Sequence, residues 1–366
     1  MADPFAAPER LLREAVEAHV FPAAAVEVGH RAGPRWSAAA GAHTYDPYAA
    51  AVTMDTVFDL ASLTKVISTA TLMMRAVDAD RVGLDEPVAS RFREWRGADR
   101  EAVTIRDLLT HSSGLPAYLP FFRDHTGRQE FQHAICTLPL EYPARTQSVY
   151  SDLGFILLGF ILEDAAAGSP GFGGVSGAYD PSASLAAQFQ RFSSFVTDEP
   201  LAFNPPRTWR TRTAPTEVDL WRGRLLTGEV HDENAWALGG AAGHAGLFGT
   251  AGAVGAFARA VLRTLAGEHV IAEPATLREF VRRAGVPSSS RALGWDTMLP
   301  TSSCGTRLSP TAIGHTGFTG TSLWIDWERD LYVVLLTNRV HPTRENDAIR
   351  RFRPALHDAV VEWVSR

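Results

Sequence analysis

Cysteine is scarce in this sequence: only Cys136 and Cys304 occur, far apart in the chain. Neither a disulfide framework nor a cysteine-rich zinc site is therefore encoded, and we expect no metal and no cofactor. Long apolar runs are also lacking, since the longest, FILLGFIL at 155–162, is too short to span a bilayer. The charged N-terminal stretch lacks the apolar segment of a signal peptide. We expect a cytoplasmic protein, or a periplasmic or secreted one if a leader has been removed.

An excess of basic residues is missing as well. The formal net charge is −6 and the sequence pI is about 6.1, which argues against nucleic acid or an acidic membrane surface as partner. The 366 residues, 45% of them hydrophobic, suffice for one large core or two closely packed subdomains. The expected partner is a small-molecule substrate, and the oligomeric state is left open.

A serine followed three places later by a lysine stands out in the segment DLASLTK, residues 59–65. Apolar residues recur at helical spacing after it, which predicts a largely buried helix that begins near Ser62. Positions i and i+3 are neighbours on a helix, so the Lys65 amine is within reach of the Ser62 hydroxyl. A desolvated amine with a lowered pKa can activate such a hydroxyl as a nucleophile. If the pair stood alone, a helix N-cap serine with a lysine whose head reaches solvent would be the favoured explanation.

Other segments suggest the architecture. Helices are predicted near 8–19, after 104, from 153, over 253–267 and over 343–365, where Pro354 should kink or restart the helix. A capping box is predicted at Thr104–Asp107. Strands are predicted at 23–30, 35–43, 292–298, 311–317, 321–328 and 331–338, and residues 167–183 read as a loop.

Strands at both ends with helices between them predict an α/β fold, with a sheet assembled from both termini, flanking helices and a mostly helical insert. We expect residues 1–80 plus 290–366 to form the sheet subdomain and residues 81–289 the mostly helical one. The functional site should then lie at their junction.

Three elements in chain order, Ser62-x-x-Lys65, Tyr150-Ser151-Asp152 and His315-Thr316-Gly317, together resemble the active-site set of serine β-lactamases and penicillin-binding proteins. The chain is most similar to the branch of class C β-lactamases, D-alanyl-D-alanine carboxypeptidases and family VIII esterases. Residues 228–250 resemble a subgroup of penicillin-binding protein 4B-like proteins. This resemblance implies a β-lactamase/transpeptidase-like fold with an antiparallel sheet.

The resemblance also assigns roles. It makes Ser62 the acylated nucleophile, Lys65 its proton acceptor and Tyr150 the group that passes the proton to the leaving group. It places the oxyanion hole at the backbone N–H groups of Ser62 and Phe318. Gly317 should lack a side chain because substrate lies against this strand edge.

Two positions depart from the family pattern. The third motif most often begins with lysine, whereas His315 is mostly neutral at pH 7 and a weaker anchor for a substrate carboxylate. Thr316 or Arg339 would have to supply that anchor, although a plain surface role suits Arg339 better.

The second departure is Asp152, where the family usually has asparagine. As a carboxylate it accepts but cannot donate hydrogen bonds, so it would hold Lys65 or accept a substrate N–H, or else only cap the helix that begins at Leu153. Ser151 either contacts Ser62 or Lys65, or caps the same helix.

A metal site at His231, Asp232 and His244 is disfavoured because these residues lack zinc-ligand spacing. The G-x-S-x-G motif of α/β-hydrolases is absent from the sequence. We therefore expect a serine acyl-hydrolase that forms an acyl-enzyme on Ser62 and hydrolyses esters and, weakly, β-lactams or D-alanyl peptides. The alternatives are a penicillin-binding protein or sensor that is acylated on Ser62 but deacylates slowly, and a true class C-like β-lactamase.

Overall fold

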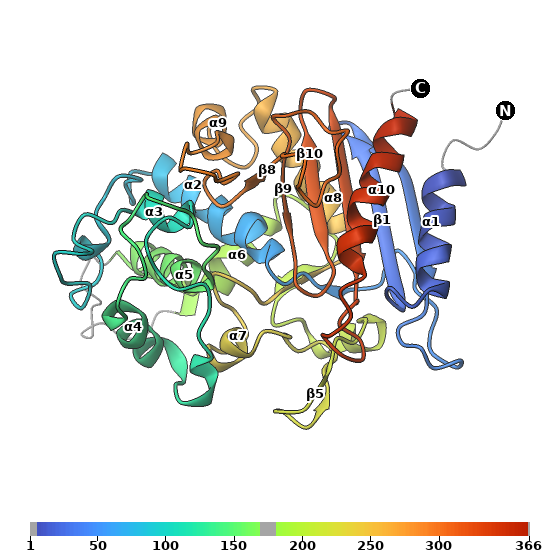
Figure 1. Ribbon diagram of the computed structural model, residues 1–366, viewed down its shortest axis with the longest axis horizontal. Helices are drawn as coiled ribbons and strands as arrows, with labels where there is room; N and C mark the ends of the chain where they lie inside the picture. Colours follow the sequence, from blue (N-terminus) through green and yellow to red (C-terminus); the bar gives the residue numbers. More distant parts are fainter. Residues whose placement is uncertain (1–5, 169–180, 365–366) are drawn as a thin grey trace.

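The computed structural model describes residues 6–168 and 181–364, and its central feature is a six-stranded antiparallel sheet built from both ends of the chain (Figure 1). The strand order is β2-β1-β11-β10-β9-β8. The strands span β1 Ala23–His30, β2 Gly33–Gly41, β8 Asp296–Thr297, β9 Ile313–Thr316, β10 Ser322–Asp326 and β11 Leu331–Thr337. The predicted α/β fold with a sheet from both termini is confirmed.

Helices cover both faces of this sheet. On one face lie α1 (Ala6–Glu17) and α10 (Ile349–Val364), which pack against each other, and on the other face α8 (Ala251–Leu265) packs against β1 and β11. Because neither face meets solvent, β11 (LYVVLLT) is buried along its whole length and reads as a continuous apolar run rather than an alternating one. Helix α8 thus belongs with the sheet although it lies within residues 81–289.

The remaining helices lie beside or below the sheet, most of them on the left in Figure 1. They are α2 Thr71–Asp78, α3 Ile105–Leu109, α4 Gly127–Thr137, α5 Asp152–Ala166, α6 Leu185–Ser193, α7 Glu233–Ala237 and α9 Pro274–Val281, with short helices at η1 Lys65–Ala70, η2 Val88–Ser90, η3 Phe121–Arg123, η4 Pro181–Ala183 and η5 Arg207–Arg212. Two small sheets complete the described chain: β3 Phe58–Asp59, β7 Leu247–Gly249 and β4 Leu201–Phe203 form one, and β5 Val218–Asp219 with β6 Arg224–Leu225 the other.

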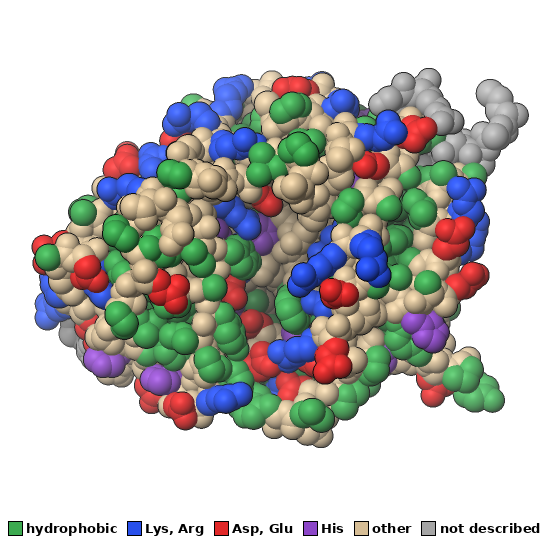
Figure 2. Space-filling view, viewed as in Figure 1, with side chains coloured by type: hydrophobic (Ala, Val, Ile, Leu, Met, Phe, Trp, Pro, Cys, Tyr) green, Lys and Arg blue, Asp and Glu red, His purple; other side chains and the backbone are tan. Residues whose placement is uncertain are grey.

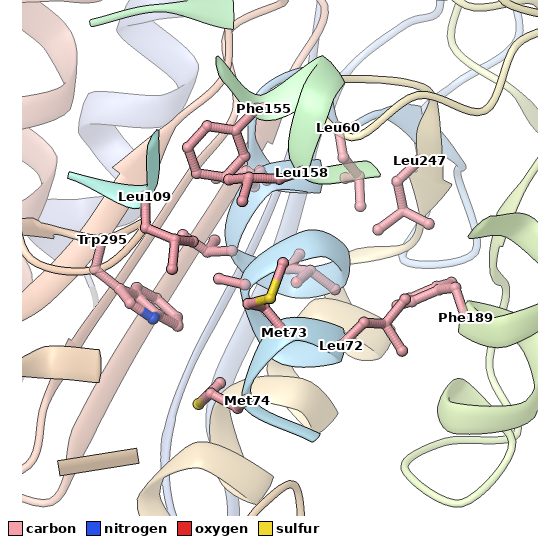
Figure 3. Close-up of a cluster of buried hydrophobic side chains, with 14 of the residues drawn as sticks. Leu60, Leu72, Met73, Met74, Leu109, Phe155, Leu158, Phe189, Leu247 and Trp295 are labelled. Atoms are coloured by element: carbon pink, nitrogen blue, oxygen red, sulfur yellow. The ribbon is translucent and has the colours of Figure 1, made fainter. Parts of the chain in front are cut away.

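The helix after Ser62 runs through the middle of the largest hydrophobic cluster. Its first part, η1, is a π-helix in which every residue is buried, and α2 continues it. Met73 of this helix packs in the same cluster as Phe155 and Leu158 of α5 and as Trp295 (Figure 3). A π-helical turn is rare and is frequently found at functional sites, so its start at Lys65 suggests a function for this part of the chain.

Most predicted elements are present, with local differences. The capping box of Thr104 and Asp107 is confirmed, and the long helix α10 continues through Pro354 instead of restarting there. Strand β8 is much shorter than the predicted 292–298. The backbone N–H groups of residues 292–294 donate to the carbonyls of Trp295, Phe280 and Leu109 rather than to β9. Most of the predicted loop 167–183 lies outside the described residues.

Among the described helices, none combines the length and apolar character that crossing a membrane requires.

Candidate active site

A cleft of about 680 Å³ lies where the sheet meets the helical region. The face drawn in Figure 2 is hollowed near its centre, and lysine and arginine side chains gather along one edge of the hollow. The cleft collects most of the residues singled out in the sequence: Ser62, Tyr150, Asp152, His315, Thr316, Gly317, Phe318 and Arg339. Lys65 lies directly beneath Ser62, fully buried.

Ser62 is presented at a sharp turn between β3 and the buried helix. Ala61, just before it, has a φ of +47°, a left-handed conformation that is unusual for a residue with a side chain. The Asp59 carboxylate accepts the Ala61 N–H at 2.8 Å and so holds this turn. The strained backbone supports a functional role for the residue that follows it.

The Lys65 ammonium is surrounded by acceptors. Its Nζ lies 3.1 Å from Ser62 Oγ, 3.0 Å from the His244 carbonyl oxygen and 2.7 Å from Asp152 Oδ1. Burial alone would lower the pKa of Lys65, but the Asp152 carboxylate and the Tyr150 phenol outweigh it and raise that pKa above its ordinary value. The expected lowering of the Lys65 pKa is therefore wrong for the resting protein, in which the lysine is charged.

Tyr150 places its hydroxyl in the same site. The Lys65 Nζ lies 4.9 Å from the centre of the Tyr150 ring, and the His111 ring packs against that ring with centroids 4.6 Å apart. The hydroxyl is buried, and Lys65 and Ser62 are the hydrogen-bonding groups beside it. Burial raises the pKa of Tyr150, and the charge of Lys65 opposes that rise. The resting phenol is thus neutral and able to give a proton rather than take one.

The turn between β9 and β10 is tied to the chain just before Ser62. Thr319 Oγ1 donates to the Asp59 carbonyl at 2.7 Å, and Thr321 Oγ1 donates to the Leu60 carbonyl at 3.0 Å. A Cβ on Gly317 would lie 2.1 Å from Thr321 Oγ1 and 2.6 Å from the Leu60 oxygen. The glycine is thus explained by packing of this turn against the Ser62 segment, rather than by the approach of substrate.

The two backbone N–H groups expected to form an oxyanion hole belong to these adjoining segments. Within the described part of the chain, neither the Ser62 N–H nor the Phe318 N–H donates to a protein acceptor. Buried or cleft-lining backbone donors are almost always paired, so two free ones beside a serine hydroxyl form a suitable site for a developing oxyanion.

His315 lies at the rim of the cleft as a neutral side chain. Burial and the charges of Arg291 and Lys65 lower its pKa well below the ordinary value. Nδ1 lies 2.8 Å from the Thr316 carbonyl oxygen, which can only accept, so Nδ1 carries the proton and Nε2 presents a buried, unpartnered lone pair. An acceptor lone pair repels a carboxylate, so His315 is unsuited to anchor one.

A second cation beside His315 is Arg291, which sequence reasoning missed. Its guanidinium lies 5.0 Å from the centre of the Tyr150 ring and lines the cleft, and none of the described carboxylates lies within ion-pair distance of it. The only signal in the sequence was its place just before the predicted strand 292–298, which does not reveal which way the side chain points.

At the start of α5, the structure separates the roles of neighbouring residues. Ser151 is the N-cap, since its Oγ accepts the Gly154 N–H at 3.4 Å and donates to the Pro116 carbonyl at 2.7 Å. It makes no hydrogen bond to Ser62 or Lys65 and does not line the cleft, so the structure favours the capping role over substrate binding. Asp152 is the first residue of the helix rather than its cap, and its carboxylate binds Lys65.

Arg339 is not a surface residue. It is 8% exposed, its guanidinium packs 4.5 Å from the centre of the Phe318 ring, and it lines the cleft. Its Nε donates to the Phe318 carbonyl at 2.8 Å, and its Nη1 donates to the carbonyls of Arg344 and Asn346. The surface interpretation is therefore wrong: Arg339 holds the β9–β10 turn through the Phe318 carbonyl, and it lines the cleft.

The histidines and aspartate considered as metal ligands form pairs instead. His244 Nε2 lies 2.8 Å from Asp232 Oδ1, and the same oxygen caps α7 by accepting the Ala235 N–H. His231 Nε2 lies 2.9 Å from Glu217. Within residues 6–168 and 181–364, no cluster of three or more histidine, cysteine or acidic side chains is placed to hold a metal ion. The His244–Asp232 pair fixes the segment whose carbonyl binds Lys65.

Comparisons with known proteins agree with this geometry. A family model described as Beta-lactamase matches residues 8–356. A putative D-alanyl-D-alanine carboxypeptidase of Salmonella gallinarum is 28% identical over 323 residues, covering 81% of this chain and 72% of that protein.

Solved structures share the fold. EstCE1, a hydrolase with promiscuous acyltransferase activity, superposes with a TM-score of 0.73 at 19% identity and covers 98% of both chains. A class C beta lactamase superposes with a TM-score of 0.73 at 17% identity and covers 97% of both chains. The match of the family model over nearly the whole sequence shows that the chain belongs to the beta-lactamase family.

Proposed function

We propose that this protein is a serine hydrolase that is acylated on Ser62 and then releases the acyl group to water. The observation that carries the proposal is the 3.1 Å contact between Ser62 Oγ and the buried Lys65 Nζ at the base of the cleft. Lys65 takes the Ser62 proton once its own proton has been lost, the free N–H groups of Ser62 and Phe318 bind the oxyanion, and Tyr150 gives a proton to the leaving group. Labelling of Ser62 by a fluorophosphonate probe, located by mass spectrometry, tests this assignment.

The charges of the cleft favour a substrate that carries a carboxylate. Four arginines that line it have no carboxylate partner among the described residues: Arg291, Arg339, Arg350 and Arg353. The cleft carboxylates that likewise lack a cationic partner there are Asp296 and Asp347, so the unpaired charge is positive. D-alanyl peptides and β-lactams bear a carboxylate, whereas simple esters do not. We therefore place acidic substrates above neutral esters, which alters the order expected from the sequence.

A matched pair of substrates measures this preference. A D-alanyl-D-alanine peptide with a free C-terminal carboxylate should have a kcat/KM at least about tenfold above that of the same peptide with a C-terminal amide, because a charge-assisted hydrogen bond is worth roughly that factor. Arg291→Gln should remove most of the difference and leave the rate on a short p-nitrophenyl ester within a few-fold. Equal rates on the two peptides would contradict a carboxylate-selective cleft.

The ion pair between Lys65 and Asp152 predicts the pH dependence of the reaction. Asp152 raises the Lys65 pKa, and acylation requires the neutral amine, so activity should be lost as the pH falls through this raised value. Asp152→Asn removes the negative charge and should shift the acid limb of the kcat/KM profile to lower pH. An unchanged limb, or a shift to higher pH, would show that Lys65 does not control acylation in this way.

A second function fits the same geometry: a penicillin-binding protein that is acylated and then stalls. In the resting site Lys65 is charged and Tyr150 is neutral, so neither is ready to activate the water that must attack the acyl-enzyme. Intact-mass spectrometry after addition of penicillin distinguishes the two. A persistent adduct on Ser62 without turnover of any ester or peptide supports the binder, and a transient adduct supports the hydrolase.

A further inference from the structure

Arg353 is a buried cation whose position the proposed reaction does not by itself require. It lies on α10, is 8% exposed, and has no carboxylate within ion-pair distance among the described residues. Burial and repulsion from Arg339 and Arg350 lower its pKa to about 9, so it remains charged at neutral pH. His357, on the same helix, is neutral and adds no second charge, because burial and the charge of Arg353 lower its pKa to about 3. A buried charge without a counter-ion costs free energy and calls for a function.

The guanidinium donates to two backbone carbonyls of the β9–β10 turn. Its Nη2 lies 2.7 Å from the Gly317 oxygen and 2.9 Å from the Thr321 oxygen. The Gly317 carbonyl belongs to the same peptide group as the Phe318 N–H, one of the two expected oxyanion donors. In a trans peptide these two groups point in opposite directions, so a cation that holds the carbonyl also fixes the direction of the N–H.

We propose that Arg353 is a positioning residue for the oxyanion hole. Its charge orients and polarises the Gly317–Phe318 peptide, and the Phe318 N–H therefore binds the developing oxyanion more strongly. Hydrogen bonds in a chain polarise one another, and a charged donor on the carbonyl oxygen draws electron density away from the N–H at the other end of the peptide. Arg339 Nε on the adjoining Phe318 carbonyl fixes the next peptide of the turn. No bond is made or broken by Arg353 itself. The proposal rests on acylation of Ser62.

The test uses p-nitrophenyl acetate, whose acyl group carries no charge that Arg353 could bind directly. Removing an oxyanion donor outright costs about 10²- to 10³-fold in kcat, and weakening one should cost less. Arg353→Met should therefore lower kcat about 10- to 30-fold with KM within about twofold of the wild-type value. Arg353→Lys, which restores a cation, should recover most of the loss. Arg351→Met, which removes an exposed charge from the same helix, should leave kcat within about twofold.

Each other result overturns the proposal. A kcat for Arg353→Met within about twofold of wild type, or an Arg353→Lys variant as slow as Arg353→Met, would exclude the polarising role. An effect confined to KM of carboxylate-bearing substrates would make Arg353 a substrate ligand instead. If Arg353→Met does not fold, Arg353→Gln keeps an N–H donor without the charge and is expected to show the same loss. Failure of the wild-type protein to form an adduct on Ser62 would reject the proposed function and is read separately, by mass spectrometry.

Discussion

Ser62→Ala is expected to abolish hydrolysis of p-nitrophenyl acetate and of nitrocefin while the protein remains folded. Removal of a nucleophile that acts together with its base costs on the order of 10⁴-fold or more in kcat. The Ser62 hydroxyl accepts one hydrogen bond from Lys65, and the lysine keeps the His244 carbonyl and Asp152 after the change. The folded state should thus lose little. Initial rates measure the first expectation, and thermal unfolding by circular dichroism measures the second.

Ser68 provides the matched control for this experiment. It lies on the same buried helix, and its hydroxyl has no hydrogen-bond partner among the described residues, so Ser68→Ala removes a hydroxyl without breaking a contact. Both variants should unfold at similar temperatures, and only Ser62→Ala should be inactive. Substantial ester hydrolysis by Ser62→Ala would mean that another group is the nucleophile.

Lys65→Met is expected to lower both activity and stability. Activity should fall on the order of 10³-fold or more, because the base beside Ser62 is removed. The free energy of unfolding should fall by about 3 kcal/mol, because breaking a buried ion pair leaves the Asp152 carboxylate without its partner. That carboxylate retains some contact with solvent, since its side chain is 19% exposed, so the loss should lie at the low end of the range for buried pairs. Urea unfolding measures the stability.

Combining Lys65→Met with Asp152→Asn separates the two effects. The double variant carries no unpaired charge, so its stability should return to within about 1 kcal/mol of wild type, and a double-mutant cycle should show strong coupling between the two positions. Activity should remain lost, because the amine is still missing. A double variant as unstable as Lys65→Met alone would show that Asp152 is not the partner whose isolation destabilises the protein.

Local sequence patterns predicted the elements that carry the site. The spacing of Ser62 and Lys65 on one helix, the capping box at Thr104 and the apolar strands each depend on residues that are near one another in the chain, where period and cap chemistry are decisive. The strands predicted at the two ends of the chain, with helices between them, were sufficient to predict the fold class. The relative placement of Ser62, Tyr150 and His315 followed from the family resemblance rather than from any local pattern.

What the sequence could not provide depends on contacts between distant segments. The charge state of Lys65 is set by Asp152 and Tyr150, which outweigh the lowering of its pKa that burial alone would cause. Arg339 lies in a short polar stretch that resembles a surface loop, yet its guanidinium is enclosed by the carbonyls of Phe318, Arg344 and Asn346. Arg291 and Arg353 were missed because no spacing rule relates them to Ser62 or Gly317.

The sheet that draws its strands from both termini has a consequence for synthesis of the protein. Ser62 and Lys65 leave the ribosome early, whereas the turn at Gly317 and the helix that bears Arg353 emerge among the last residues, and β1 acquires its neighbour β11 only then. Chains are made from the N-terminus, so a nascent chain carries Ser62, the proposed nucleophile, through much of translation before the β9–β10 turn and α10 are present. If the proposed reaction holds, a chain that stops before β9 should not be acylated, and one that stops before α10 should be acylated more slowly than the chain that contains it.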